Sequence, residues 1–397
     1  MARRLAYGAV AILILAACRE PSAVGPISAG VSKFTTAPSS LGWQERARGL
    51  VGSANMSPLA AARVYAALSV AQYRAIRATD DGDNDDTQRE HGIGVGGRAA
   101  LEARRGAVAG ASAAVLSFFF SSASASFEQR VQDEGNAGPG GVHPAFTRGV
   151  ARGRAAGAAM VQRLQHDGFT TPWTGSIPVG PGKWTANGPP AGATFGGVSP
   201  YFLNSAGQFR PGEPPAFGSP AFLTDLNEIR SLALTRTPEQ RALAIQWNYG
   251  TGSFTPIGYW DLVTANYITD YGLDERAATR ALALTTGAMM DALIACWDAK
   301  YNYFYIRPPQ ADPTITLALA LPNHPSYPSG HSCSSAAAAT VLSELFPEQR
   351  AGLAAQVTEA GLSRMYAGIH YRFDITAGQV LGNSVARWAL KHQRRLR

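Results

Sequence analysis

The sequence has few cysteines, few charged residues and no long hydrophobic run beyond its N-terminus. Three cysteines in 397 residues are too few for a disulfide-built scaffold, and none has a histidine or second cysteine at zinc-ligand spacing. Charged side chains make up only 16% of the chain and hydrophobic ones 46%, which excludes a disordered chain. A globular protein with a large buried core is therefore expected.

Stretches of β-branched residues are also scarce. Alanine-rich runs dominate, whereas the 42 glycines and 25 prolines gather in connecting segments. This composition predicts an all-α, multi-helix bundle. Ser57 and Pro58 form a typical helix start, with a capping hydroxyl followed by proline at the first helical position. Helices are expected over residues 58–75, 98–116, 146–166 and 276–297.

One segment interrupts this helical pattern. Residues 171–220 are dense in Gly, Pro and Trp, and a loop of such length is either a linker or functional. Its aromatic residues argue against a bare linker. A single helical domain is expected over residues 43–397, with N-terminal helices in 43–170 and the helices that carry the chemistry in 221–397.

The N-terminus has the pattern of an export signal. In residues 1–17, two arginines precede an apolar run that is too short to span a bilayer. The following Leu-Ala-Ala-Cys, ending at Cys18, resembles a bacterial lipobox, in which the cysteine is acylated; a plain signal peptide is the alternative. Residues 18–42 predict a flexible tether. The expected location is a membrane-tethered lipoprotein in the periplasm or on the cell surface.

The net charge of +7 does not indicate a nucleic-acid-binding protein, because the basic residues form no stripe. Their tight cluster at the C-terminus is interpreted as a solvated tail; it consists of Lys391, Arg394, Arg395 and Arg397. A scattered basic excess suits an enzyme that draws in anions.

The acidic segment Asp80–Asp86 spaces its first aspartates like a calcium loop. It lacks the glycine and the closing glutamate of such a loop, so a solvated turn is predicted and a cation site is the alternative. Cys296 and Cys333 leave a similar choice open, between a disulfide and two inert packing residues.

Two short motifs in the last hundred residues present groups suited to an anion. Lys300 and Arg307 are separated by six residues and followed by proline, so a helix end and the next turn carry two cations. The sequence Pro-Ser329-Gly330-His331 then opens an alanine-rich helix. Its glycine permits close backbone approach, and the free N–H groups of the first helical turn face an anion.

A third motif adds a cation, an imidazole and a carboxylate. Arg364 follows a serine, and His370 and Asp374 are predicted to share one helix face at positions i and i+4. Each motif alone could be structural or solvent-exposed. Together they supply what a tetrahedral oxyanion requires, namely three cations, a hydroxyl, an amide and two imidazoles.

In this order, Lys-x6-Arg-Pro, Pro-Ser-Gly-His and Ser-Arg-x5-His-x3-Asp resemble the signature motifs of the superfamily of type 2 phosphatidic-acid phosphatases and vanadium-dependent haloperoxidases. The likeness extends from about Leu41 to the C-terminus, and Cys-Trp-Asp-Ala-Lys-Tyr at 296–301 is similar to bacterial haloperoxidase-like members. One departure is Tyr259, which stands between Gly and Trp where related bacterial sequences often have His.

The resemblance implies a helical bundle with an oxyanion at its centre. In haloperoxidases the counterpart of His370 binds vanadium, and that of His331 is the acid/base. The groups that surround the oxygens correspond to Lys300, Arg307, Ser329, Gly330 and Arg364. In phosphatases of the family, phosphate occupies the same site, the counterpart of His370 is the nucleophile and that of His331 protonates the leaving group.

Three functions therefore remain. The first is a vanadate-dependent haloperoxidase that oxidises bromide or iodide with hydrogen peroxide. The second is a soluble acid phosphatase acting on a phosphate ester through a phosphohistidine, and the third an oxyanion-binding lipoprotein without turnover. His324, seven residues before His331, favours the first, because algal bromoperoxidases are similar here whereas fungal chloroperoxidases carry Phe. His324 and Asp374 are added to the expected catalytic residues. The halide, the organic acceptor and the oligomeric state stay open.

The lipobox can be tested directly. Cys18→Ser should release the protein from the membrane fraction without changing its activity, because the acyl chains supply the attachment and the tether separates them from the fold. The measurement is the distribution of activity between membrane and supernatant after fractionation. Mutant protein that stays membrane-bound after correct signal cleavage would contradict the lipobox.

Overall fold

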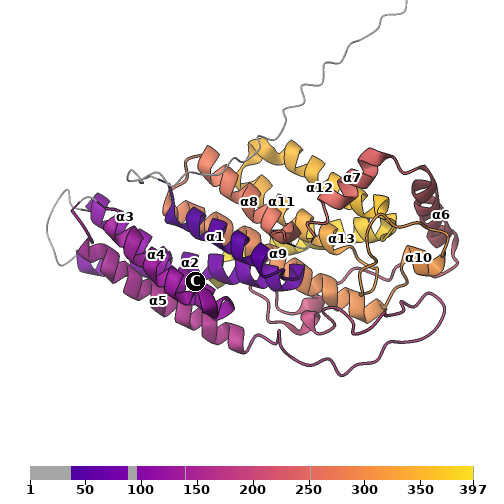
Figure 1. Cartoon of the computed structure of the whole chain (residues 1–397), viewed down its shortest axis with the longest axis horizontal. Helices are drawn as coiled ribbons and strands as arrows, with labels where there is room; N and C mark the ends of the chain where they lie inside the picture. Colours follow the sequence, from indigo (N-terminus) through magenta and orange to yellow (C-terminus); the bar gives the residue numbers. More distant parts are fainter. Residues whose placement is uncertain (1–36, 88–95, 139, 251, 397) are drawn as a thin grey trace, which may run out of the picture. The chain divides into compact units, whose positions relative to one another are not determined.

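The computed structural model describes residues 37–87, 96–138, 140–250 and 252–396, and within them the regular secondary structure is helical with no β-strand (Figure 1). This confirms the predicted all-α class. The helices before the long loop are α1 (Ser39–Ser53), α2 (Pro58–Thr87), α3 (Gly96–Phe119), α4 (Ser124–Asn136) and α5 (Pro144–Gln165). Those after it are α6 (Pro220–Thr235), α7 (Pro238–Gln246), α8 (Thr255–Asp270), α9 (Glu275–Tyr303), α10 (Pro308–Ala311), α11 (Gly330–Leu345), α12 (Arg350–Tyr366) and α13 (Arg372–Lys391). Short 3-10 helices are η1 (Ser121–Ala123), η2 (Phe195–Gly197), η3 (Ala206–Phe209), η4 (Pro347–Gln349) and η5 (Gln393–Leu396).

Helix α9 lies in the core of the bundle. Its start is set by Asp274, whose carboxylate accepts a hydrogen bond of 2.8 Å from the amide of Ala277. Helices α2, α8, α11 and α13 pack around it, and nearly all of its side chains between residues 278 and 300 are buried. Such a helix has no polar face, which is typical of the centre of a large bundle. It carries Lys300 to its last turn.

Helix α13 packs closely against α11 because small residues face each other. Ala336, Ala337 and Ala338 of α11 are buried, and two glycines of α13 leave room for the α11 backbone. A Cβ atom at Gly378 would lie 2.8 Å from the carbonyl oxygen of Ser329, and one at Gly382 would lie 2.2 Å from that of Cys333. Only glycine permits this approach, which brings the N-terminus of α11 beside the start of α13.

The long loop after α5 is packed against α9, so it is not a linker. The carboxylate of Asp291, buried in α9, accepts hydrogen bonds from the amides of Tyr201 (2.7 Å), Phe202 (2.7 Å) and Leu203 (2.9 Å). Three backbone donors satisfy a carboxylate that burial would otherwise penalise. The loop is thereby attached to the C-terminal half of α9, the half that carries Lys300.

The structure contradicts two of the sequence predictions. Asp80–Asp86 was predicted to be a turn, but α2 continues through it to Thr87, because Asp80 is held by Arg104 (Nε to Oδ1, 2.8 Å) rather than exposed at a helix end. A calcium loop cannot form on a continuous helical backbone. Helix α1 begins at Ser39, whereas the predicted tether extends to residue 42.

Several other predictions concern single segments. The signal peptide and Cys18 lie outside the described residues. In the described part of the chain, no helix is both long and apolar enough to cross a bilayer. Cys296 and Cys333 are buried and not bonded to each other. Residues Thr36–Arg397 form one compact unit.

The close packing of α11 and α13 predicts that Gly378→Ala is destabilising by about 1–3 kcal/mol, because the new methyl group overlaps the Ser329 carbonyl. Gly352→Ala on α12 is the matched control. Nothing lies within 4 Å of a Cβ at that position, so the same change should stabilise by about 0.4–1 kcal/mol. Urea unfolding of both variants measures the difference, and equal effects at the two positions would contradict the packing argument.

Candidate active site

Three buried cations converge near the C-terminal end of α9. Lys300 comes from the last turn of α9, Arg307 precedes α10 and Arg364 lies in the last turn of α12; their exposed fractions are 0%, 0% and 1%. Within the described residues none of them forms a salt bridge, although the buried carboxylate of Asp374 lies close enough to influence Lys300 and Arg307 electrostatically. The cluster therefore keeps an excess of buried positive charge, which is costly unless an anion joins it.

Backbone carbonyl oxygens hold the ammonium group of Lys300. Its Nζ atom donates to the carbonyls of Pro325 (2.9 Å), Ser326 (2.7 Å) and Pro328 (2.5 Å). These dipoles orient the ammonium but carry no net charge, so burial still lowers the pKa of Lys300 to about 8. The segment between Arg307 and α11 thus wraps around the end of α9.

The two guanidinium groups are held in the same way. Arg307 donates from Nε to the carbonyl of His324 (3.0 Å) and from Nη1 to that of Ile369 (2.7 Å). Arg364 donates from Nη2 to the carbonyl of Ala244 (2.6 Å) at the end of α7. Burial lowers the pKa of both groups, yet a guanidinium remains protonated near neutral pH.

Hydrogen bonds determine which nitrogen of His370 carries the proton. Its Nδ1 atom lies 2.8 Å from Oδ2 of Asp374, and its Nε2 atom lies 3.2 Å from Nη1 of Arg307. A guanidinium only donates, so Nε2 accepts and the proton resides on Nδ1. Burial, reinforced by Arg307 and Lys300, lowers the pKa of His370 well below its usual value. The neutral ring therefore directs a lone pair toward the cations.

Asp374 orients this histidine. Its Oδ2 atom also accepts hydrogen bonds from the hydroxyl of Ser326 (2.6 Å) and the amide of Tyr371 (3.2 Å). The pairing of His370 with Asp374 was predicted, but on a shared helix face, and that geometry is wrong. His370 precedes α13, whereas Asp374 lies in its first turn, where its carboxylate binds the free amide before the helix.

Two further imidazoles belong to the cluster. The Nδ1 atom of His324 lies 3.0 Å from Nη2 of Arg307, so it accepts from the guanidinium. The Nε2 atom of His331 lies 2.9 Å from the carbonyl oxygen of Trp247 and must donate to it, which leaves the lone pair on Nδ1. Burial lowers the pKa of His331 to about 3 and that of His324 well below its usual value. Both rings are neutral.

The N-terminus of α11 completes the arrangement. Ser329 is its N-cap residue, and its own amide donates to the carbonyl of Asp374 (3.0 Å), which ties the start of α11 to α13. A Cβ atom at Gly330 would lie 3.1 Å from the ring of Trp297, so a larger residue there would crowd the ring. The predicted helix start is confirmed, and the hydroxyl oxygen of Ser329 accepts a hydrogen bond from the amide of Ser332 (3.4 Å).

The sequence did not identify several residues that support this cluster. Trp247 and Ala244 act through backbone carbonyls, which leave no signature in a sequence. Ser326 lies inside the His-Pro-Ser-Tyr-Pro-Ser-Gly-His stretch, and this position was the one available signal for it. Tyr259, the departure from related sequences, packs behind Trp247 with ring centroids 5.1 Å apart and donates to Gln356 (2.8 Å).

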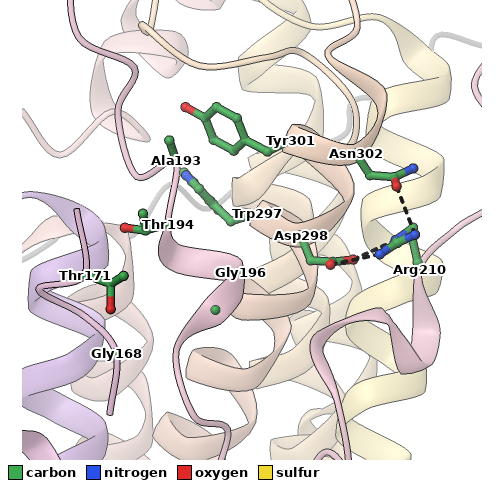
Figure 2. Close-up of a pocket in the computed structure, with 11 residues that line it drawn as sticks. Gly168, Thr171, Ala193, Thr194, Gly196, Arg210, Trp297, Asp298, Tyr301 and Asn302 are labelled. Atoms are coloured by element: carbon green, nitrogen blue, oxygen red, sulfur yellow. Dashed lines mark hydrogen bonds and ion pairs between the residues drawn. The ribbon is translucent and has the colours of Figure 1, made fainter. Parts of the chain in front are cut away.

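Trp297 separates the cluster from a surface cavity of about 480 Å³. Its ring centroid lies 5.0 Å from that of His324, and its Nε1 atom donates to the carbonyl of Ala191 (3.2 Å). Figure 2 shows the cavity side of Trp297, with Tyr301 nearby and Arg210 paired with Asp298. The last turns of α9 therefore present Lys300 to the cation cluster, and Trp297, Asp298 and Tyr301 to the cavity.

In the described residues, fold and site together define an all-helical protein with a buried cluster of cations that suits an oxyanion. Residues 279–397, which include all three motifs, match the PAP2 superfamily. The match confirms the resemblance that the motifs indicated, and it covers the part of the chain that carries them.

Proteins that are similar to this chain in sequence include acid phosphatases. The chain is 29% identical over 179 residues to a non-specific acid phosphatase of Providencia stuartii, an alignment that covers 43% of this chain and 68% of the relative. It is 44% identical over 57 residues to a non-specific acid phosphatase of Salmonella typhi, covering 14% and 23% of the two chains.

Solved structures that are similar to this chain include haloperoxidases. A bacterial vanadium-dependent iodoperoxidase superposes with a TM-score of 0.73 at 24% identity, covering 91% of this chain and 98% of the other. The holo form of a bacterial vanadium-dependent chloroperoxidase gives a TM-score of 0.69 at 15% identity, covering 92% and 97%. At these identities the likeness establishes the fold.

The buried cations predict anion binding that depends on pH. Sulfate keeps one charge state between pH 7 and 10, so its affinity reports on the protein. Above about pH 8 the free Lys300 loses its proton and must regain it when the anion binds, so affinity should fall by up to tenfold per pH unit. Calorimetric titration at several pH values measures this fall. Lys300→Gln should bind more weakly with a flat profile, and an unchanged slope in that variant would contradict the assignment.

Proposed function

We propose that the protein is a vanadate-dependent haloperoxidase that oxidises bromide or iodide with hydrogen peroxide. The observation that carries this proposal is the third imidazole. His324 accepts a hydrogen bond from Arg307 (3.0 Å) and lies against Trp297, whereas hydrolysis through a phosphohistidine needs only two imidazoles, a nucleophile and an acid. The similarity to haloperoxidase structures along almost the whole chain supports the same reading, whereas the phosphatase relatives match shorter segments.

The donor set fits vanadate. His370 would hold vanadium through Nε2, the nitrogen whose lone pair faces the cations. Lys300, Arg307 and Arg364 would neutralise the oxygens, helped by the hydroxyl of Ser329 and the amide of Gly330. Bound vanadate would supply a Lewis acid that polarises hydrogen peroxide for attack by halide.

His331 is suited to move a proton. Its Nε2–H is held by the Trp247 carbonyl, so Nδ1 is the nitrogen that can accept a proton from hydrogen peroxide. Burial and the charge of Arg364 keep this ring neutral. His324, whose Nδ1 atom accepts a hydrogen bond from Arg307, would assist His331 in this proton transfer. Asp374 keeps the proton of His370 on Nδ1 and thus preserves the ligand nitrogen.

A second function, acid phosphatase, is favoured by one feature of the same geometry. A neutral imidazole with its proton held by a carboxylate and its lone pair aimed at three cations is also an activated nucleophile. His370 would then attack phosphorus, forming an N–P bond as the P–O bond to the ester oxygen breaks. His331, once it has taken up a proton on Nδ1, would pass that proton to the leaving oxygen. Water would hydrolyse the phosphohistidine. The sequence relatives support this alternative.

The proposed location follows from the N-terminal pattern. Acylation at Cys18 would tether the enzyme outside the cytoplasm, where peroxide and halide or phosphate esters are available to it. The tether would hold the fold near the membrane surface.

Substitution of His370 separates the two functions. In a haloperoxidase, His370→Ala should weaken vanadate binding at least a hundredfold and abolish peroxide-dependent oxidation of bromide and iodide. In a phosphatase, it should abolish the phosphohistidine that rapid quenching traps in the parent. The measurements are vanadate binding by calorimetry, halide oxidation with and without vanadate, and phosphohistidine by mass spectrometry.

The control is His166→Ala, a change at an exposed histidine at the end of α5, which should leave every rate unchanged. His331→Ala should retain vanadate binding while losing oxidation. If vanadate-loaded parent protein oxidises no halide and metal-free protein hydrolyses aryl phosphates through a trapped phosphohistidine, the haloperoxidase proposal is wrong.

A further inference from the structure

A second group of arginines lies at the other end of α9. Two come from the first turns of α9, one from α2 and one from the C-terminal η5, and they line a cavity of about 310 Å³. The lining consists of Tyr73, Arg77, Arg276, Arg280, Gln393 and Arg394. Among these described lining residues there is no aspartate or glutamate.

Nearby carboxylates neutralise this group only in part. Arg276 lies 3.3 Å from Oδ2 of Asp80, but Asp80 already binds Arg104 at 2.8 Å. Arg77 lies 3.3 Å from Asp81, whose side chain is 65% exposed, so water screens that pair. Two carboxylates thus face four guanidinium groups: Asp80, which is shared with Arg104, and Asp81, which is exposed.

The remaining donors of the arginines have weak partners or none. Arg280 donates from Nε (3.0 Å) and Nη2 (2.7 Å) to the amide oxygen of Gln393, which is neutral. The Nε atom of Arg77 is buried without a hydrogen-bond partner. Arg394 is exposed at the mouth of the cavity and has neither a hydrogen bond nor an ion pair with any residue that the structure describes. A buried donor without a partner, such as Nε of Arg77, is rare in folded proteins and is usually explained by a bound water or ion.

The described part of the C-terminal basic cluster is exposed to solvent, as the sequence predicted, but it is not a free tail. Arg395 donates to the carbonyl of Phe202 (2.7 Å) and to Oδ1 of Asn204 (2.7 Å), and Leu396 is buried. Arg74 donates to the carbonyl of Leu396 (3.0 Å). These bonds fix η5 in place, so Arg394 is held at the cavity.

This cavity is separate from the oxyanion site. Arg276 and Lys300 lie 24 positions apart on the same helix, which corresponds to about 36 Å along its axis. An anion bound at one end therefore does not contact the groups at the other end.

We propose that this cavity binds a phosphate group, supplied either by free phosphate or by the headgroup of an anionic phospholipid. Guanidinium groups bind phosphate through paired N–H···O bonds, and several of them can share one doubly charged anion. The N-terminal end of α9 adds a positive dipole on the same side. The ligand would join η5 to α2 and α9.

Calorimetric titration of the full chain with inorganic phosphate tests this site. Arg394→Gln should weaken one class of binding site at least tenfold, and Arg280→Gln with Arg394→Gln should abolish it, while vanadate-dependent halide oxidation or ester hydrolysis stays at the parent level. Arg148→Gln, an exposed arginine on α5 outside the cavity, is the control and should bind like the parent. Thermal midpoints in phosphate-free buffer confirm that the variants fold.

Comparing the affinities of two probes distinguishes the two sources of the phosphate group. Tighter binding of inorganic phosphate than of glycerophosphoglycerol, a soluble phosphodiester headgroup, indicates free phosphate; the reverse order indicates a lipid. If the parent has no class of site that the Arg394 variants weaken, or if Arg148→Gln weakens it equally, the proposed site does not exist.

Discussion

The burial of three cations without carboxylate partners of their own is the constraint on which the rest of the site depends. Lys300, Arg307 and Arg364 are almost completely removed from water, and the backbone carbonyls around them carry only dipoles. Such a cluster repels itself in a low dielectric and favours any oxyanion that fits. Three separate segments supply those carbonyls: the end of α7, the segment before α11 and the turn before α13.

The pair of Asp374 and His370 converts this attraction for anions into chemistry. One carboxylate oxygen fixes the proton of His370 on Nδ1 and accepts from Ser326 and the Tyr371 amide, so the imidazole cannot turn its lone pair away. A lone pair aimed at a bound tetrahedral anion can ligate vanadium or attack phosphorus. This explains why proteins of this fold and sequence include both haloperoxidases and phosphatases.

Small residues make the site compact. The glycines of α13 let its backbone approach α11, and the amide of Ser329 reaches the carbonyl of Asp374 at 3.0 Å. The histidine that precedes α13 and the free amides that begin α11 therefore face the same volume. Stability and function share these contacts, because larger side chains would separate the two helices before they altered any reacting group.

The sequence by itself determined the helical class, the positions of the long helices, the long loop and most of the site. Local patterns encode these features: alanine runs and caps set helices, and short motifs of fixed spacing carry the charged groups. Tertiary structure alone decided which backbone carbonyls hold His331 and Arg364, that His370 meets Asp374 before the helix and not along it, that Asp80–Asp86 is helical, and that Arg394 lines a cavity. The physical reason is that these outcomes depend on partners more than twenty residues away or on backbone atoms, which every residue shares and no local pattern distinguishes.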